Sequence, residues 1–227
     1  MNQANLWHII VAAGTGSRFG GDLPKQYCLL RGRPLLMTTI ERLRRATPEA
    51  HILLVVSAGM HAFWQELCAQ YGFESPAVVH GGATRFESVS RGIAAVPEDA
   101  EVISVHDGAR PLIDADTVAR TLSALEESGA DGVIPAVAVS DSLRRQGADG
   151  SSAIVDRTGI VAVQTPQIFR AASLRRAYAL PFSPQFTDDA SVMEAAGGRI
   201  ALAEGNTYNI KVTRPADLRL AETLLSL

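Results

Sequence analysis

Apolar runs rich in β-branched residues alternate along the chain with longer stretches in which apolar positions recur at helical spacing. The run at 6–13, LWHIIVAA, precedes the helical pattern of 34–46, and the run at 51–57 precedes that of 60–72. The alternation continues through residue 139. Short apolar strands followed by helices of ten or more residues are typical of a mainly parallel sheet covered on both faces. The pattern predicts a doubly wound α/β fold.

The alternation stops between Val139 and Arg157, where two short β-like pieces flank the turn sequence GADGSS. This segment is predicted to form a β-hairpin arm. Because a hairpin is only marginally stable by itself, we expect the arm to pack on another surface, and a second subunit is the natural candidate.

The rest of the chain is predicted to hold three helices and two strands. Helices are expected over SLRRAYAL, TDDASVMEAAG and RPADLRLAETLLSL, and strands over RIALAEG and YNIKV. The last helix places Leu218, Ala221, Leu224 and Leu225 on one face. Because no linker or repeat interrupts the sequence, residues 1–227 are expected to form a single domain with the arm at about 139–157.

The composition and net charge of the chain limit the kinds of ligand that it is expected to bind. The 227 residues carry a formal net charge of −3, and 47% of them are hydrophobic. This allows a substantial core but no general basic surface, so we expect no nucleic-acid partner, and a few placed cations must bind any phosphate ligand. The segment MNQANLWHII lacks the pattern of a secretory leader, and no apolar run approaches membrane-spanning length. We expect no membrane association and a cytoplasmic location.

The glycine-rich loop after the first predicted strand is the first candidate for chemistry. A turn of this kind can present backbone N–H groups to a phosphate. The dinucleotide-binding fingerprint requires a third glycine where this chain has Phe19, following Gly14 and Gly16. A Walker A loop requires Lys and Ser or Thr where Gly21 is followed by Asp22. Both of these phosphate-binding loops are therefore excluded.

Two cations accompany the glycines of this loop, Arg18 and Lys25. Together with small Ala12 and Ala13, such a loop could approach a nucleotide with its backbone while the cations stabilise charge that develops on an attacked phosphorus. An ordinary strand-to-helix turn with two solvated cations remains the alternative.

The segment VHDGARP ends another apolar strand, at the edge where open α/β sheets bind their ligands. Asp107 could coordinate Mg²⁺ while the ion bridges phosphates, and Arg110 could bind an anion through two nitrogens. An aspartate at a strand end is also a common turn former or helix cap, which is the alternative interpretation.

The segment HGGATRFESVSRG places a glycine pair before a helix that is expected to begin near Thr84. Ser88 and Arg85 lie on its first turns, where they could face a base or a phosphate, and Gly82 precedes them. Capping of the helix by Thr84, with Glu87 completing a capping box, explains the same residues structurally. Both interpretations can hold together.

Three further segments supply single candidates. Thr165 precedes a proline, which favours extended geometry and an exposed hydroxyl. Thr187 is expected to cap a helix, with Asp188 and Asp189 in its first turn. Lys211 is expected on the late strand YNIKV, as an edge residue that faces water or as a cation for a ligand.

The chain resembles the 2-C-methyl-D-erythritol 4-phosphate cytidylyltransferases of the non-mevalonate isoprenoid pathway, from Ile9 to the final helix. The resemblance rests on seven segments in order: AAGTGSRFGGDLPKQY, GGATRFESVSRG, VHDGARP, VDR, TPQ, TDDAS and NIKVTRPADL. It implies a Rossmann-like nucleotidyltransferase fold and transfer of CMP from CTP to methylerythritol phosphate, with release of pyrophosphate. It also implies a requirement for Mg²⁺ and a homodimer whose arms clasp.

The resemblance also implies a role for each matching residue. Backbone and small side chains would hold the nucleotide at Ala12, Ala13, Gly14 and Gly16, and Gly82 and Ser88 would read the cytosine. Arg18 and Lys25 would be the catalytic cations, and Asp107 would hold Mg²⁺. The sugar phosphate would meet Arg110, Thr165, Thr187 and Lys211, together with Ser142 and Arg157 from the arm of a partner subunit.

Two other functions remain open from the sequence. A ribitol-5-phosphate cytidylyltransferase would share the nucleotide motifs and use a different polyol phosphate; Asp141–Ser142 and 155–157 favour the isoprenoid enzyme. A nucleotide-binding regulator without catalytic activity would keep the glycines but would have no reason to keep Arg18, Lys25 and Asp107 together.

Overall fold

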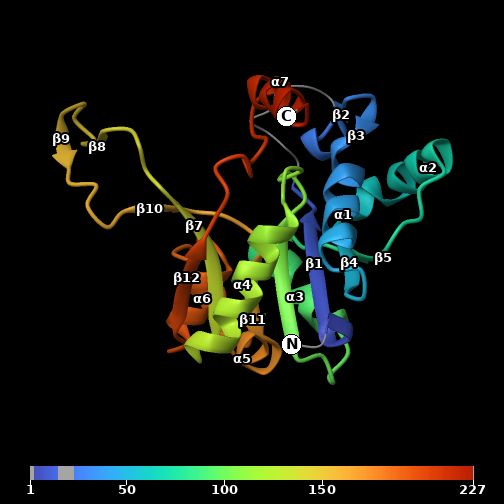
Figure 1. Cartoon of the computed structure of the whole chain (residues 1–227), viewed down its shortest axis with the longest axis horizontal. Coiled ribbons are helices and arrows are strands. Elements are labelled where there is room, and N and C mark those ends of the chain that lie inside the picture. Colours follow the sequence, from blue (N-terminus) through green and yellow to red (C-terminus); the bar gives the residue numbers. More distant parts are fainter. Residues whose placement is uncertain (1–2, 15–22, 227) are drawn as a thin grey trace.

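The computed structural model describes residues 3–14 and 23–226, which are arranged around one large sheet (Figure 1). The strands of this sheet are β1 (Leu6–Ala12), β4 (His51–Val56), β5 (Ala77–His80), β6 (Val102–Asp107), β7 (Gly132–Ala138), β10 (Val161–Val163), β11 (Gln167–Arg170) and β12 (Ile200–Glu204). Their order is β10-β7-β11-β6-β1-β4-β5, and β12 pairs with β7. The predicted α/β class is confirmed.

The sheet is mostly parallel, with a short antiparallel insertion that the sequence pattern did not predict. Strands β1, β4, β5 and β6 run parallel, and so do β7 and β12. Between β6 and β7 lies β11, which is antiparallel to both, and β10 is antiparallel to the end of β7. These two strands of three and four residues are too short to show a recognisable period.

Helices cover both faces of the sheet, as a doubly wound fold requires. They are α1 (Leu35–Ala46), α2 (His61–Tyr71), α3 (Arg85–Ala95), α4 (Ala115–Ser128), α5 (Ala171–Ala177), α6 (Asp189–Ala195) and α7 (Pro215–Leu224). Neighbouring strand residues point to opposite faces, so Ile9 packs in one core cluster with Val89 of α3, and Ile10 packs in another with Ile40 of α1. No helix in the described ranges is both long and apolar enough to span a membrane.

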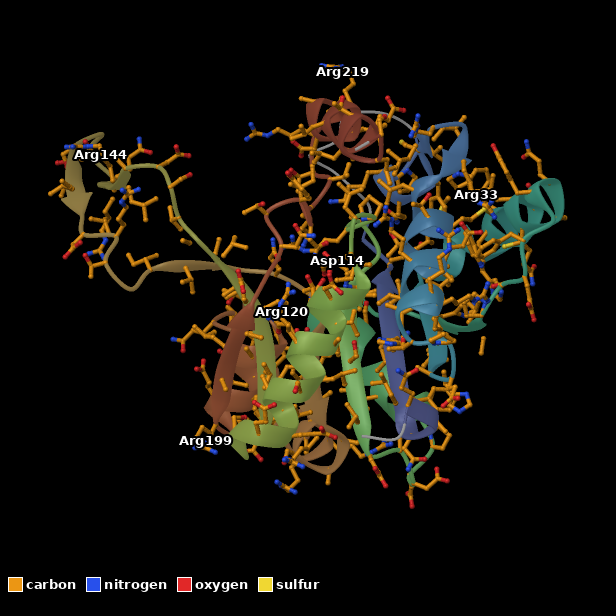
Figure 2. The ribbon with its side chains drawn as sticks, in the orientation of Figure 1. Arg33, Asp114, Arg120, Arg144, Arg199 and Arg219 are labelled. Atoms are coloured by element: carbon orange, nitrogen blue, oxygen red, sulfur yellow. The ribbon has the colours of Figure 1, made fainter. Side chains whose placement is uncertain are left out.

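The predicted arm is confirmed as a β-hairpin. Strands β8 (Leu143–Gln146) and β9 (Ser152–Val155) pair antiparallel, and Arg144 Nε donates to Ser152 Oγ across them at 2.8 Å. Figure 1 shows the hairpin extending away from the sheet and its helices, and Figure 2 shows Arg144 at its far end. Ile154 on β9 is 80% exposed.

The prediction of a strand over YNIKV is wrong. Strand β12 ends at Glu204, and the following segment crosses the carboxyl edge of the sheet without joining it. Its backbone is held at Val212, whose N–H donates to the Ala109 carbonyl at 2.9 Å. Val212 is buried in a small core cluster beside Ile210 and the residues of α7. The apolar alternation of this segment therefore reflects packing against α7, the helix whose apolar face was predicted.

Side chains anchor the same segment to the neighbouring elements. Asp114, at the beginning of α4 (Figure 2), accepts a hydrogen bond from the Asn206 amide, and Arg120 of α4 donates to the Glu204 carbonyl at 3.2 Å. The Asn209 amide donates to the Thr165 carbonyl at 2.8 Å. These contacts fix the path that brings the next residues over the sheet edge.

Buried His8 should make the stability of the fold depend on pH. Its ring bridges Ser104 Oγ and Thr47 Oγ1 at 2.9 and 2.8 Å, and burial, with a further electrostatic contribution from titration of His106, lowers its pKa from 6.5 to about 3. The unfolded chain therefore binds the proton more readily, so stability is complete above pH 6.5 and is lost as pH falls toward 3. Between pH 7 and 5, the free energy of unfolding should fall by about 2 kcal/mol from this residue.

Chemical denaturation at both pH values, with His8→Asn as the comparison, measures this contribution. The variant is expected to lose about 2 kcal/mol less than the wild-type protein between the two pH values. An equal loss in both proteins would show that His8 is not protonated on unfolding.

Candidate active site

A pocket with a cavity volume of about 460 Å³ opens at the carboxyl edge of the sheet. This size suits a small-molecule ligand, and the position is where open α/β sheets bind their ligands. Nine of the residues singled out in the sequence line it: Ala12, Ala13, Gly14, Lys25, Gly82, Arg85, Ser88, Asp107 and Lys211. Gly16 and Arg18 lie outside the described residues.

The strand register explains why the end of β1 and Asp107 lie side by side. Strands β1 and β6 are parallel neighbours, and Val11 is paired with Asp107. Beyond the pair, the Gly108 N–H donates to the Val11 carbonyl at 2.9 Å. A Cβ on Gly108 would come within 3.1 Å of the Ala12 Cβ, so this close approach of two backbones requires glycine or a shift of the neighbours. Asp107 thus lies beside the end of β1 and lines the same pocket as Ala12 and Gly14.

Gln26 holds the end of β1 and Gly14, a role that sequence reasoning missed. It lies in a short 3₁₀ helix, Lys25–Tyr27, and its side-chain amide donates to the carbonyls of Ala12 at 2.8 Å and Gly14 at 2.9 Å. Nothing local distinguishes this buried glutamine from a surface one, because both acceptors are more than ten residues away. The two bonds connect the end of β1 to the turn that carries Lys25.

The residues before and at the start of α3 form a second wall of the pocket. Thr84 caps the helix, and its hydroxyl accepts from the Glu87 N–H at 3.1 Å, as predicted. The Glu87 carboxylate accepts from Ala83 N–H at 2.7 Å rather than from Thr84, so the expected capping box is displaced by one residue. Ser88 Oγ donates to the Thr84 carbonyl and accepts from the Gly82 N–H, at 2.9 and 3.1 Å. The glycine pair is therefore held against the first turn of the helix.

Asp107 lies among three cations. Lys211 Nζ is 2.7 Å from Asp107 Oδ2, and one nitrogen each of Arg85 and Arg110 lies 3.7 Å from the carboxylate. Burial raises the pKa of Asp107, but the charges of Arg85, Lys211 and Arg110 outweigh burial and hold this pKa well below its usual range. The carboxylate is therefore ionised throughout the neutral range, and it borders the pocket.

The prediction that the Thr165 hydroxyl is exposed is wrong. Thr165 is buried, and its hydroxyl accepts from the Asp107 N–H at 3.1 Å and lies 3.0 Å from His106 Nδ1. Burial lowers the pKa of His106 to about 4, so the ring is neutral, and its Nε2 donates to the Arg110 carbonyl at 3.1 Å. His106 Nδ1 is then an acceptor, and Thr165 donates to it. Antiparallel pairing of β11 with β6 causes this burial, and Thr165 orients Asp107.

The remaining predicted substrate residues lie outside the pocket lining. Arg110 donates to the Asn209 carbonyl at 2.8 Å, close to Asp107. Thr187 is exposed and is not the cap of α6, contrary to the prediction. Asp188 caps that helix by accepting from the Ser191 N–H at 2.9 Å, because its other oxygen is held by Gln167 of β11 at 2.8 Å.

The two predicted arm residues are not brought to the pocket of their own chain. Ser142 is exposed near the base of the hairpin. Arg157 is also exposed, and its guanidinium donates to the carbonyls of Val139, at 3.2 Å, and Ser140. The bonds join the two limbs of the arm where the arm leaves the sheet.

Lys25 and Lys211 are the only two lysines in the sequence, and both line the pocket. The other nineteen basic residues of the Lys and Arg total are arginines. A lysine ammonium is a compact point charge with rotatable donors, which suits a phosphate whose geometry changes during reaction.

Fold and pocket together place the chain among the α/β nucleotidyltransferases, since backbone glycines, an ionised carboxylate and lysines converge at the carboxyl edge of a mostly parallel sheet. Comparison with known proteins makes the assignment specific. The family described as 2-C-methyl-D-erythritol 4-phosphate cytidylyltransferase matches residues 6–226. The chain belongs to this family, and the prediction from the sequence is confirmed.

Similar proteins carry the same description. The 2-C-methyl-D-erythritol 4-phosphate cytidylyltransferase of Porphyromonas gingivalis is 48% identical over 226 residues, which cover 99% of each chain. That of Bacteroides fragilis is 43% identical over 218 residues, covering 96% of this chain and 98% of its own. The crystal structure of the Thermus thermophilus protein of that name is 31% identical, with a TM-score of 0.75 over 97% of this chain and 98% of its own.

Proposed function

We propose that this chain transfers CMP from CTP to 2-C-methyl-D-erythritol 4-phosphate and releases pyrophosphate. Family membership supports the reaction. The observation that carries the proposal is that Lys25, Asp107 and Lys211, far apart in sequence, line one pocket with Ala12, Ala13 and Gly14. A nucleotide-binding regulator would not require these charges to converge, and the family match does not favour ribitol 5-phosphate as acceptor.

Nucleotide binding is proposed for the two walls of the pocket. Backbone groups at Ala12, Ala13 and Gly14, with Gly16, hold the triphosphate side, and Gly82 and Ser88 read the base. The Ser88 hydroxyl donates its single proton to the Thr84 carbonyl, so it can offer a ligand only an acceptor. Cytosine presents an amino donor at C4, whereas uracil presents an oxygen acceptor there. The hydrogen bonding of Ser88 therefore favours CTP over UTP.

The transfer step needs little general-base catalysis. An ionised phosphate oxygen of methylerythritol phosphate attacks the α-phosphorus of CTP, forming a new P–O bond as the bond to the β-phosphate oxygen breaks. The electron pair of that bond leaves with pyrophosphate. Because a phosphate monoester is largely ionised near neutral pH, the nucleophile arrives deprotonated. Arg18 and Lys25 are proposed to stabilise the negative charge that develops at the α-phosphate.

Mg²⁺ is proposed as the cofactor, and Asp107 as the residue that holds it. The described residues contain no group of three or more histidine, cysteine or acidic side chains suited to a metal. A single ionised carboxylate beside a triphosphate pocket fits Mg²⁺, which is commonly bound through one or two carboxylates plus substrate phosphates. When bound, the ion would neutralise charge on the phosphates. The Thr165 hydroxyl accepts from the Asp107 N–H and donates to the neighbouring His106 ring, and these bonds hold the backbone of Asp107 in place.

The polyol phosphate is proposed to bind on the side of Lys211 and Arg110, whose cations lie around Asp107. Thr187, which precedes the cap of α6, is proposed to contact the same substrate, whereas Thr165 is proposed to act through Asp107. Arm-to-arm pairing of two copies is proposed because the arm extends away from the body of its own chain (Figure 1) and carries the exposed apolar side chain of Ile154 on β9. The proposed compartment is the cytoplasm.

A substrate panel tests the proposal directly. Purified protein with Mg²⁺ is given CTP or UTP, combined with methylerythritol phosphate or ribitol 5-phosphate, and released pyrophosphate is measured. The highest kcat/KM is expected with CTP and methylerythritol phosphate. A preference for ribitol 5-phosphate, or the absence of pyrophosphate release with every pair, would contradict the proposed reaction.

A further inference from the structure

A buried ion pair joins the nucleotide wall of the pocket to helix α6. Arg85, the first residue of α3, donates from Nη1 and Nη2 to Asp189 Oδ1 and Oδ2 at 2.8 and 2.7 Å. Asp189 is completely buried, and the Tyr178 hydroxyl donates to its Oδ1 at 2.6 Å. Both terminal nitrogens of Arg85 therefore form a bidentate pair with the Asp189 carboxylate.

The same guanidinium is close to Asp107 without being bonded to it. Arg85 Nη2 lies 3.7 Å from Asp107 Oδ1, which is longer than a hydrogen bond, whereas Lys211 lies 2.7 Å from Oδ2. Asp107 Oδ1 is thus the oxygen left without a short ion pair among the described residues. A small rotation of Arg85 toward Asp107 would close such a pair.

We propose that Asp189 is a positioning residue for Asp107. By holding both terminal nitrogens of Arg85, it keeps the guanidinium 3.7 Å from Asp107, beyond hydrogen-bond distance, and leaves Oδ1 available to a divalent cation that arrives with the nucleotide phosphates. In this proposal Arg85 is a part of the support rather than a nucleotide ligand, the role expected from the sequence. The inference rests on the proposed function of the pocket.

The energetics of buried charge give the direction of the effect. Breaking a buried ion pair by removing one partner leaves an uncompensated charge that seeks another counter-ion. In an Asp189→Asn variant, the nearest carboxylate to Arg85 is Asp107. Arg85 would then compete with the divalent cation for Oδ1. Removing the positive charge as well, in Arg85→Met/Asp189→Asn, removes the competitor and replaces the pair with side chains of similar size.

Binding of the Mn²⁺–CTP complex, measured by the enhancement of water proton relaxation when protein is added, tests this inference without a catalytic readout. The wild-type protein should enhance relaxation with saturable binding. The Asp189→Asn variant is expected to bind Mn²⁺–CTP about tenfold more weakly, because an unshielded cation faces the metal site. The double variant Arg85→Met/Asp189→Asn is expected to bind within about threefold of wild type.

Asp188→Asn provides the matched control, because Asp188 adjoins Asp189 but caps α6, and an asparagine can cap a helix equally well. It should bind Mn²⁺–CTP like wild type. Equal binding by Asp189→Asn and wild type, or a double variant as weak as Asp189→Asn, would overturn the inference.

Two further outcomes are separable from these. If Asp189→Asn does not fold, the double variant decides: affinity near wild type supports the inference, and a tenfold loss shows that Arg85 contacts the nucleotide and overturns it. Failure of the wild-type protein to bind Mn²⁺–CTP at all would overturn the proposed function, and with it the inference. Failure of the variants alone leaves the proposed function standing.

Discussion

Replacement of Lys25 with alanine should lower kcat for CMP transfer by about a thousandfold or more, while the fold remains intact. Lys25 is half-buried and borders the pocket beside Gly14. A fixed cation at this place would oppose the charge that grows on the α-phosphate, and it is worth more in the transition state than in the ground state. The Gln26 amide holds the carbonyls of Ala12 and Gly14, so the loss of the Lys25 side chain should not displace these two residues.

Single-turnover measurements with saturating CTP separate this effect from substrate binding. Lys25→Arg, which keeps a charge but changes its shape, should recover part of the rate. Arg45→Ala removes an exposed cation of α1 and should stay within about twofold of wild type, since surface substitutions away from special features have small effects. A Lys25→Ala enzyme within tenfold of wild type would show that Lys25 does not stabilise the transition state.

The lysine content of the chain allows a second measurement of the same prediction. Because Lys25 and Lys211 are its only lysines, a reagent that acetylates amines can modify only these two side chains and the N-terminal amine. CTP should slow acetylation of Lys25, as followed by mass spectrometry. Unchanged acetylation of Lys25 at saturating CTP would show that the nucleotide binds elsewhere.

The order of strands and helices could be predicted from sequence because each element shows its own period. Ile9 and Ile10 face opposite cores, so β1 reads as a continuous apolar run, as a strand buried on both faces should. Strand β11 could not be predicted in this way. Its four residues form a strand because they pair with β6 and β7, whose residues are distant in sequence. Such pairing leaves no local pattern in the sequence.

In the candidate site, too, the roles that depend on residues nearby in sequence could be predicted, and the roles that depend on distant residues could not. Asp107 was recognised because it ends an apolar strand, and the cap at Thr84 because its partner is three residues away. Lys211 was expected on a strand, and only the folded chain shows that it crosses the sheet edge to pair with Asp107. Asp189 looked like a first-turn residue of a helix, but its importance comes from the buried contact with Arg85.

Mixed dimers of Lys25→Ala and Arg157→Ala subunits should regain activity that neither parent possesses. Each parent is expected to be weak, because the first lacks a catalytic cation in every site and the second lacks the arm contact in every site. Arg157 lies at the base of an arm that extends away from the sheet and its helices (Figure 1). If each site combines one body with the partner's arm, a mixed dimer contains one site with both residues intact.

The amount of recovered activity identifies the arrangement. Random assembly of equal amounts makes half of the dimers mixed, and each of these carries one intact site, so about a quarter of wild-type activity is expected. Sites built within one chain would recover none, because every chain carries one of the two substitutions. Mixed dimers must be shown by native mass spectrometry after co-refolding, so that absent activity cannot arise from absent mixing. Arg157 donates to the carbonyls of Val139 and Ser140, and these bonds could hold the arm in place. If this is the contribution of Arg157, an Arg157→Lys variant, which keeps a donor, should lose less activity than Arg157→Ala.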